Sequence, residues 1–465
     1  MLNALKKPCS ARIFCRLLKG LIIFLLIIMQ IRGVFVYASQ KHLKEADTRL
    51  EYINLPFWQK FNDDILIHYI VCAISNNYGL KALRTRINEV RAAKNIEVSK
   101  QFPSFSVGAN YLGLKIPRVA IPFQGFRDNA FALPFITHWE IDLFGKRKNK
   151  IDMAFEDINS SIYEEKGAAI ALASEVAGIY FNISNLNSQI EIQERVIENK
   201  KEKLARVQKS FNVGVLGAQA LNNAKKEAEY EEIVLNDYKK QKRGFILNLA
   251  YLMGEAPDNI RDYAFSDIKT VEFKGQIPDC INSDITFQRP DVLQKEAALK
   301  KAKIDITLAR KEFLPNINVF GVLMFSTLTP NFRWDGAVAN LLAGATETLF
   351  SGGRRIFNLK AKKFVYERLL NEYLESDLLA LKEINDVLYQ LKTDIKTYNS
   401  NLSNLGFEED NFIRVSNSYR YGVSNRFDVL DSNNSFLYEK SKLLNSKVQK
   451  FADLISLFKA TGGCL

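Results

Sequence analysis

Two aspartates near the C-terminus, Asp428 and Asp431, are the residues of this 465-residue chain whose type and spacing best suit a functional site. A separation of three residues places both carboxylates on one face of a helix, where they can attract cations. The same residues also suit ordinary helix capping, since Asn425 can cap a helix whose third residue is Asp428. On residue types and spacing alone, capping is the favoured interpretation.

The sequence contains no pattern typical of an enzyme. It has no nucleophile elbow, phosphate-binding loop, metal-binding His/Cys cluster or Rossmann glycine run. The histidines and the cysteines of the mature chain lack ligand spacing and are well separated: His42, His68, His138, Cys72, Cys280 and Cys464. We therefore predict no catalytic residue, no cofactor, no metal and no disulfide framework.

The net charge of +12 does not indicate a nucleic-acid partner. Lysines and arginines alternate with acids along the predicted helices, as in the segment 194–203, and this pattern is typical of a solvated helix face. No nucleic-acid-binding motif is present.

Residues 1–38 are predicted to be a secretory signal peptide. Basic residues precede a short apolar run, 20–31, and Val36 and Ala38, as small residues at −3 and −1, favour cleavage after Ala38. An uncleaved anchor is the alternative, but Arg32 interrupts the run. After Ile31 we expect no stretch with the apolar length of a membrane-spanning helix, which is ~20 residues. If the mature chain enters a membrane, it must do so as a closed β-barrel.

The chain contains an internal duplication. The segment 210–215, SFNVGV, recurs as SYRYGV at 418–423, so that Gly422 follows Gly214 by 422 − 214 = 208 residues. We divide the mature chain into a first structural repeat, 39–254, and a second, 255–465. A unit of this length is too long for a solenoid repeat, and it predicts one architecture built twice.

Each repeat is predicted to supply two strands, at about 104–115 and 134–144 and at about 316–327 and 338–350. Residues 104–111 alternate strictly between apolar and polar side chains, which is the pattern of a barrel strand between lipid and lumen. A soluble antiparallel sheet is the alternative. Four strands cannot close a barrel, because single-chain barrels begin at about eight strands. A barrel therefore needs at least two chains, and three chains would give twelve strands.

Long helices are predicted at 147–212, 218–253, 355–418 and 425–460. The first contains no proline and would span roughly 100 Å at ~1.5 Å per residue, so it must pack along other helices. Shorter helices, 80–100 and 291–312, end before Pro103 and Pro315. The breaks between the long helices are the hairpin tips, which comprise two triplets centred on glycine: Val213, Gly214, Val215 and Tyr421, Gly422, Val423.

Several motifs give the chain a resemblance to the TolC-like outer-membrane factors, and within that family to the partners of resistance-nodulation-division pumps. They are RPDV at 289–292, EAAL at 296–299, FLPNI at 313–317, FWQKF at 57–61, WEIDLFG at 139–145 and LFKATGG at 457–463. The resemblance runs from about residue 56 to the C-terminus.

The resemblance implies a mainly α protein with a membrane β-barrel. Its fold would be an internally duplicated trimer with a twelve-stranded β-barrel in the outer membrane, continued by a twelve-helix α-barrel tunnel through the periplasm. The hairpin tips would dock on a periplasmic adaptor and an inner-membrane pump. The homotrimer would be a passive exit duct of a tripartite efflux system. The alternatives are the outer-membrane duct of a type I secretion system and a soluble periplasmic coiled-coil adaptor protein.

The resemblance also implies that Asp428 and Asp431 form the channel constriction. They follow Gly422 at +6 and +9, as the ring aspartates of the family do, and threefold symmetry would gather six carboxylates around one axis. Two departures are evident. No lipid-modified cysteine is predicted after the signal peptide, and Ser424 and Ala220 occupy the places of an Arg–Asp pair that closes the tip in TolC itself.

Overall fold

The computed structural model describes residues 51–116, 126–256, 263–278, 280–327 and 337–464. The predicted signal peptide, 1–38, lies outside the described residues. The chain divides into two compact units, Met1–Leu55 and Pro56–Leu465. The first unit contributes the 3₁₀ helix η2 (Glu51–Ile53), and helix α2 (Leu55–Gln59) begins at the boundary. All further elements belong to the second unit.

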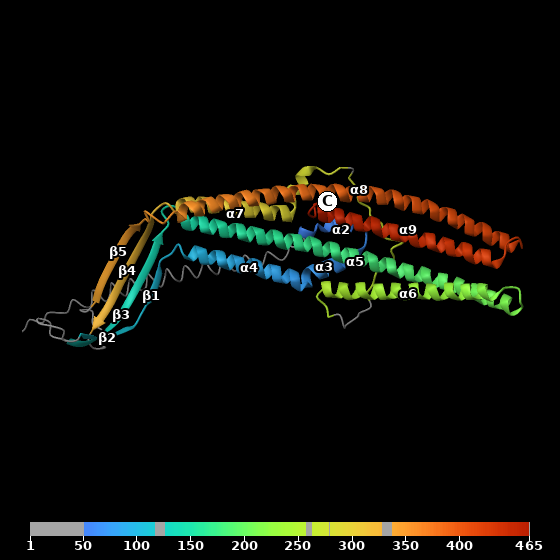
Figure 1. Cartoon of the computed structure of the whole chain (residues 1–465), viewed down its shortest axis with the longest axis horizontal. Coiled ribbons are helices and arrows are strands. Elements are labelled where there is room, and N and C mark those ends of the chain that lie inside the picture. Colours follow the sequence, from blue (N-terminus) through green and yellow to red (C-terminus); the bar gives the residue numbers. More distant parts are fainter. Residues whose placement is uncertain (1–50, 117–125, 257–262, 279, 328–336, 465) are drawn as a thin grey trace, which may run out of the picture. The chain divides into compact units, whose positions relative to one another are not determined.

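Four long helices dominate this unit: α5 (Lys146–Asn212), α6 (Ala218–Leu252), α8 (Arg354–Arg420) and α9 (Arg426–Ala460). Helices α5 and α8 have 67 residues each, and α6 and α9 have 35 each. The hairpins α5–α6 and α8–α9 pack through contacts between α5 and α9, and all four helices run side by side (Figure 1). Each helix lies within two residues of its predicted bounds.

Shorter helices cover the remaining parts of α5 and α8. Helix α3 (Asp64–Asn76) and helix α4 (Tyr78–Ser99) pack on α5, while α7 (Pro290–Lys311), preceded by the 3₁₀ helix η3 (Ser283–Gln288), lies between α5 and α8 (Figure 1). Pro103 and Pro315 stand directly before a strand, as predicted, because proline cannot continue a helix.

The strands form one antiparallel sheet in the order β1–β3–β4–β5. They are β1 (Ser104–Val107), β2 (Asn110–Ile116), β3 (Phe126–Ile141), β4 (Asn316–Thr327) and β5 (Ala337–Thr346). Because β1 and β2 pair with consecutive stretches of β3, they act as one interrupted strand, and the described sheet is four strands wide. This width agrees with the four predicted strands.

The bounds of two predicted strands were wrong. The strand predicted at 134–144 begins at Phe126 and ends at Ile141, where the Leu143 amide donates to the Ile141 carbonyl and starts a turn. Its first half was missed because the polar run 127–129 breaks the alternation. The strand predicted at 338–350 ends at Thr346, before Gly352 and Gly353 adopt positive φ angles of 60° and 82°.

The core lies where the short helix α2 meets α5 and α9. Fully buried aromatic rings pack there, among them Phe57, which stacks on Phe458 with ring centroids 4.4 Å apart, and Phe61, whose ring is tilted against that of Phe181 at 5.2 Å. This core corrects one expectation. A window within α5 does have the length and composition of a membrane-spanning helix, but 67% of it is buried inside the chain. Its apolar character serves packing against the neighbouring helices.

Candidate functional site

The first hairpin tip is closed by backbone hydrogen bonds around Gly214. The amides of Val215 and Leu216 both donate to the Ser210 carbonyl, at 2.9 and 3.3 Å, and Gly214 adopts a φ of 76°. Only glycine takes this left-handed conformation without steric cost. The turn leaves Val213 and Val215 exposed at the extremity of the hairpin.

The second tip repeats this geometry. The amides of Val423 and Ser424 donate to the Ser418 carbonyl, at 2.8 and 3.3 Å, and Gly422 has a φ of 77°. Tyr421 is 85% exposed, and Val423 is exposed beside it. Both predicted tip glycines thus adopt the positive φ expected of them, and each tip presents apolar side chains to solvent.

Apolar packing holds the two hairpins together near their tips. Phe427, in the first turn of α9, packs against a small cluster formed by Val207 of α5 with Leu221 and Ala224 of α6. One ring from the second hairpin therefore packs on the apolar cluster of the first, and the two tips lie together at one end of the helices (Figure 1).

Asp428 caps helix α9. The Asn425 amide donates to Asp428 Oδ2 at 3.1 Å, and the Asp428 amide donates to Asn425 Oδ1 at 2.9 Å. This reciprocal pair is a capping box. Asp428 therefore caps α9, which is the interpretation that residue types and spacing alone favoured. Its side chain is exposed, so capping does not prevent a second role.

Asp431 lies one turn further along α9 and has a basic partner on α5. Lys203 Nζ donates to both carboxylate oxygens of Asp431, at 2.8 and 3.0 Å, while the Asp431 side chain stays 52% exposed. Sequence reasoning missed this partner. The signal was present, because Lys203 precedes Gly214 by 11 residues (214 − 203) and Asp431 follows Gly422 by 9 (431 − 422), so both lie at similar distances from the tips.

A second ion pair between α5 and α9 lies closer to the tip. Arg426 binds both oxygens of Glu202, with Nε at 2.8 Å and Nη2 at 2.7 Å, and Arg206 adds a further hydrogen bond at 3.0 Å. The hydrogen bonds from Arg426 outweigh partial burial and lower the pKa of Glu202 to about 2. These bridges join the two hairpins close to both predicted constriction residues.

Behind the ion pairs, the contact between α5 and α9 is lined with uncharged polar side chains. Asn199 Nδ2 donates to Asn434 Oδ1 at 2.8 Å, Asn185 Nδ2 donates to Asn445 Oδ1 at 2.8 Å, and Gln189 Nε2 also reaches Asn445 Oδ1 at 3.1 Å. Partly buried amide pairs of this kind favour one register of the two helices, since a shift would leave them unpaired.

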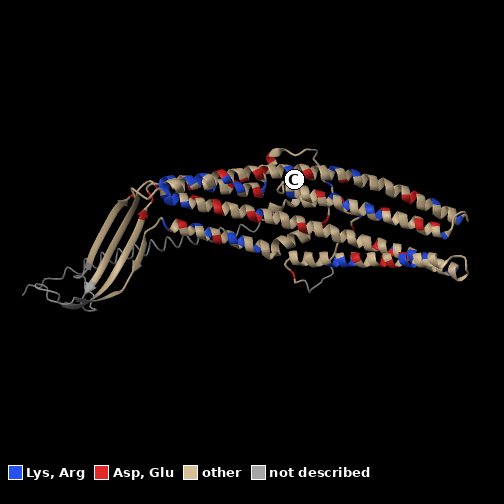
Figure 2. Cartoon of the chain, in the orientation of Figure 1, with Lys and Arg blue, Asp and Glu red and all other residues tan. Residues whose placement is uncertain are grey.

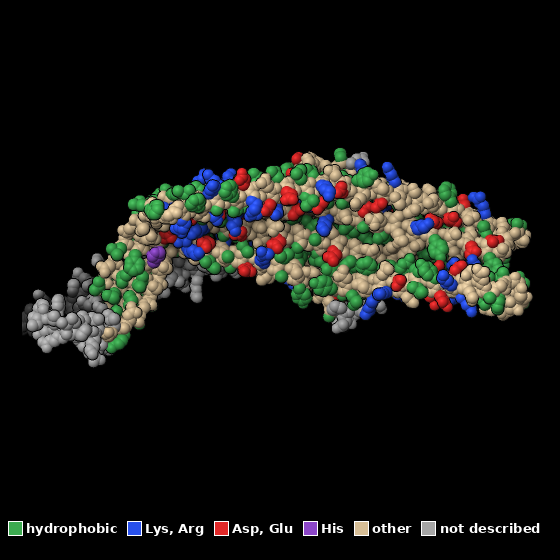
Figure 3. Space-filling model, viewed as in Figure 1, with side chains coloured by type: hydrophobic (Ala, Val, Ile, Leu, Met, Phe, Trp, Pro, Cys, Tyr) green, Lys and Arg blue, Asp and Glu red, His purple; other side chains and the backbone are tan. Residues whose placement is uncertain are grey.

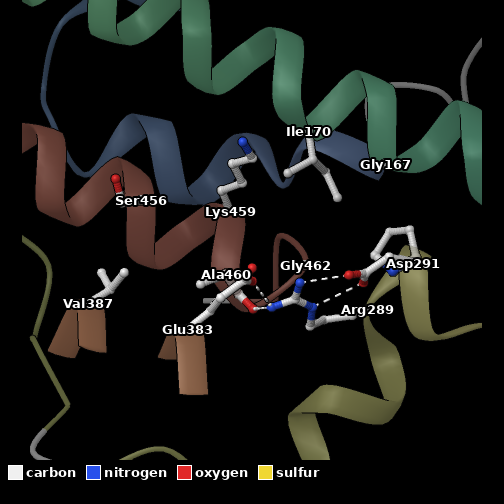
Figure 4. Close-up of a pocket in the computed structure, with 11 residues that line it drawn as sticks. Gly167, Ile170, Arg289, Asp291, Glu383, Val387, Ser456, Lys459, Ala460 and Gly462 are labelled. Carbon is white, nitrogen blue, oxygen red and sulfur yellow. Dashed lines mark hydrogen bonds and ion pairs between the residues drawn. The ribbon is translucent and has the colours of Figure 1, made fainter. Parts of the chain in front are cut away.

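A cavity of about 500 Å³ lies where α5, α7, α8 and the end of α9 meet (Figure 4). Its side is formed by Arg289, which is 7% exposed and donates to Asp291, to Glu383 at 2.8 Å and to the Ala460 carbonyl at 2.9 Å. All these acceptors belong to the chain itself. Gly462 packs so closely against the Arg289 backbone that a Cβ at position 462 would lie 2.9 Å from the Arg289 Cα. The residues around this cavity therefore form a structural joint between the elements.

The edges of the described sheet carry exposed apolar side chains. Phe105 and Val107 on β1 are exposed, and so are Leu341 and Leu342 on β5. Within the described residues, neither edge has a further strand beside it. Among these residues no group of three or more His, Cys, Asp or Glu side chains is arranged to hold a metal ion.

Comparison with known proteins identifies the family. The family model of outer membrane efflux proteins matches residues 70–255 and 283–463, which is more than half of the chain. The toluene efflux pump outer membrane protein TtgC of Pseudomonas putida is 22% identical over 418 residues, covering 87% of this chain and 84% of that protein. The cation efflux system protein CusC of Escherichia coli is 24% identical over 421 residues, covering 87% and 88%.

A solved structure has the same fold. The Campylobacter jejuni CmeC outer membrane channel superposes with a TM-score of 0.80 at 22% identity, and the match covers 87% of each chain. The resemblance to outer-membrane factors, drawn above from the motifs, is thereby confirmed, and the secretion-duct and soluble-adaptor alternatives are not favoured. This chain belongs to the outer membrane efflux protein family and is an efflux channel protein of the outer membrane that extends into the periplasm.

Proposed function

We propose that three copies of this chain form one duct, with a shared twelve-stranded β-barrel in the outer membrane and a twelve-helix tunnel in the periplasm. The observation that carries the proposal is the open, four-stranded sheet. Within the described residues no further strand pairs with its edges, so rows of backbone N–H and C=O groups have no partner strand there, and in a bilayer each unpaired group costs several kcal/mol. Closing the sheet between copies removes every edge, and four strands from each of three copies give the twelve.

The internal duplication supports the same assembly. Helices of equal length follow the paired strands in both halves of the chain, which agrees with the repeats proposed at 39–254 and 255–465. Two hairpins per copy would give a tunnel wall of twelve helices with nearly equivalent neighbours all round. Helices of 67 residues need such neighbours over their whole length to be stable in water.

The proposed partners are a periplasmic adaptor and an inner-membrane pump, and the hairpin tips are the proposed docking site for the adaptor. The exposed side chains of Val213, Val215, Tyr421 and Val423 give each copy two small apolar knobs at the end of the helices. An apolar groove on an adaptor can bury these knobs. The duct itself performs no reaction and passes what the pump delivers. Relatives are named for toluene efflux and for cation efflux, which agrees with selection of the cargo by the pump and not by the duct.

The exit route can be tested in cells. Deletion of this protein should leave the pump and adaptor in place but raise the cellular content of their cargo, and detergent should be required to extract the protein from the outer membrane. Unchanged cargo content in the deletion strain, with no second outer-membrane channel expressed, would contradict the proposal.

Asp428 and Asp431 are the proposed constriction of the duct. The ion pair between Lys203 and Asp431 changes how much each aspartate would contribute. Threefold symmetry would gather three copies of each charge, but Lys203 neutralises much of the Asp431 charge, so Asp428 would supply most of the cation preference. In planar bilayers, Asp428→Asn combined with Asp431→Asn should reduce cation preference and block by multivalent cations. Lys203→Gln should act in the opposite direction by releasing the Asp431 charge.

The matched control is Asp410→Asn on α8, an exposed carboxylate whose nearest basic partner, Arg414, is 4.0 Å away. This variant should conduct as the unmodified channel does. If properly assembled Asp428→Asn, Asp431→Asn and Lys203→Gln channels all kept the original selectivity, both aspartates would serve only as the cap and the ion pair within one copy.

A further inference from the structure

Lysines and arginines gather where the sheet meets the long helices (Figure 2). Helices α5 and α8 begin there and α7 ends there: Lys311 Nζ donates to the Gly145 carbonyl at 3.2 Å, and Asn358 Nδ2 donates to Glu312 Oε2 at 3.1 Å, which joins the three ends. We name the exposed basic residues at these ends the basic collar. They are Lys148 and Lys150 on α5, Arg310 on α7, and Arg354, Lys360 and Lys363 on α8.

Several acids around the collar are already engaged by other groups. Glu140 pairs with Arg147, and Glu347 pairs with Arg355. Asp142 accepts the Lys148 backbone amide at 2.9 Å and so caps the start of α5. No ion pair to a described carboxylate engages any collar side chain. The collar therefore carries six positive charges per copy that form no ion pair with a described carboxylate, and Lys360 lies over the Phe364 ring, 5.8 Å from its centroid.

Helix stability does not explain the charges at the start of α5 and α8. Both helices lack an acid in their first turn, although acids are the residues that stabilise the positive end of a helix dipole. Lys148 and Arg354 lie in these first turns, where a basic residue is unfavourable, whereas Arg310 lies in the last turn of α7, where a basic residue is favourable. An anionic partner would account for the basic residues that begin α5 and α8.

Exposed apolar side chains lie directly beside the collar. Leu143 stands between β3 and α5, and Leu349, Phe350 and Phe357 stand between β5 and the first turn of α8. Phe350 is 87% exposed. Figure 3 shows hydrophobic and basic side chains adjacent at this end of the helices. A band of apolar side chains followed within one or two helical turns by Lys and Arg is the pattern of a membrane–water boundary.

We propose that the basic collar binds the phosphate groups of anionic phospholipids in the periplasmic leaflet of the outer membrane. The inference rests on the proposed function, because it needs the sheet in the bilayer. The apolar band then lies at the level of the acyl chains, and the collar lies at the level of the headgroups. A Lys or Arg close to an anionic lipid surface favours binding about fivefold. The collar thus selects the lipids that surround the duct and fixes its depth.

The test uses Trp139 as a natural reporter. It lies two residues before the end of β3, next to the collar, and it is 36% exposed, whereas Trp58 is fully buried. The full chain, with Trp334→Phe, is reconstituted in phosphatidylcholine vesicles that contain a small fraction of phosphatidylglycerol. Either lipid carries brominated acyl chains, which quench nearby tryptophan. Brominated phosphatidylglycerol should quench about fivefold more strongly than its mole fraction predicts, and high salt should abolish this excess.

The decisive variant replaces Lys148, Lys150, Arg310 and Arg354 by Gln. Its excess quenching should disappear. A matched control removes the same charge from the exposed cations Lys225, Lys226, Lys240 and Arg243 of α6, which lie far from the sheet, and it should retain the excess. Exchanging Lys for Arg and Arg for Lys at the four collar positions should also retain it.

Three results would overturn the proposal. They are quenching in proportion to mole fraction, an excess that salt does not change, and an equal loss in the α6 control. Displacement of the anionic lipid by inorganic phosphate at matched ionic strength would instead identify a free-phosphate site and also contradict a lipid role. Absence of quenching by either brominated lipid would mean that the sheet is not in the bilayer, which defeats the proposed function itself.

Discussion

Replacing Glu202 by Gln should loosen the hairpin tips of this channel protein. The change keeps the size of the side chain but removes the charge that accepts two hydrogen bonds from Arg426 and one from Arg206. Because these bonds cross from α5 to α9, the first two turns of α9 should open more often when they weaken.

The magnitude follows from the pKa of Glu202, which falls from 4.5 to about 2. At about 1.36 kcal/mol per pH unit, this shift corresponds to roughly 3 kcal/mol as an upper limit. Both side chains of the pair are about one-third exposed, at 33% and 34%, so solvent screening reduces the contribution to about 1 kcal/mol. An opening free energy lower by that amount makes exchange-competent opening about fivefold more frequent.

The sign of the pH dependence is fixed by the lowered pKa. The stabilisation is complete above pH 4.5 and disappears as the pH falls through about 2, because the folded protein then takes up the proton. The difference between the original protein and Glu202→Gln should therefore be largest near neutral pH and should vanish in strong acid.

Hydrogen–deuterium exchange of the detergent-purified protein measures this opening directly. Peptides covering 418–431 should exchange about fivefold faster in Glu202→Gln, while peptides from the sheet should not change. Asp410→Asn, which disturbs only the exposed contact with Arg414, is the control. Equal exchange at the tips of Glu202→Gln and the original protein at neutral pH would refute the reasoning.

Three further predictions concern the joints of the fold. Gly422→Val should introduce about 1–2 kcal/mol of backbone strain, because residue 422 has a φ of 77°, and it should reduce adaptor binding in a pull-down. The control Gly406→Ala, in open space within α8, should leave adaptor binding unchanged. Normal adaptor binding by Gly422→Val would place docking elsewhere. The pKa of Asp453 is raised from 3.8 to about 6 by burial and by a facing aspartate on α8, which adds a hydrogen bond and a like charge. The free energy of unfolding should therefore fall by up to about 3 kcal/mol as the pH rises through 6. Asp453→Asn should abolish that fall in urea titrations. Arg289→Met should lower the free energy of unfolding by about 1–3 kcal/mol, mainly by leaving the buried Ala460 carbonyl unpaired, because the other partner, Glu383, is 45% exposed. An unchanged thermal midpoint would contradict the structural role given to this contact.

The long helices could be predicted closely because their signals are local. The segment from Lys146 to Asn212 contains no proline, and Gly214 marks its end through a backbone conformation that other residues avoid. The same local logic predicted the turn at Gly422 and the capping box between Asn425 and Asp428.

Features that depend on another helix could not be predicted in the same way. The partners of Asp431 and Arg426 lie on α5, more than two hundred residues away in the chain, and only the packing of α5 on α9 brings them together. The apolar length of the window in α5 was likewise not predicted, because this window serves packing against the helices that bury it. The early end of β5 at Thr346 depends on the turn before α8 rather than on hydrophobic alternation.

The lipid preference proposed for the collar adds a constraint on assembly. If the collar and the apolar band define the depth of the barrel, the tips hang at a fixed distance below the membrane, set by helices of 67 residues. At ~1.5 Å per residue these helices extend roughly 100 Å into the periplasm. The adaptor must then meet the tips at a fixed distance from the outer membrane. Lipid binding at the collar would therefore influence adaptor docking at the tips.

The mass of the complex released from the outer membrane in mild detergent tests the central claim most directly. Native mass spectrometry should give a single species of three mature chains, with the infrared signal of an antiparallel sheet retained, because only closure between copies satisfies the edges of β1 and β5. A monomer that keeps the full sheet signal, or a complex of any other number of chains, would contradict the shared twelve-stranded barrel.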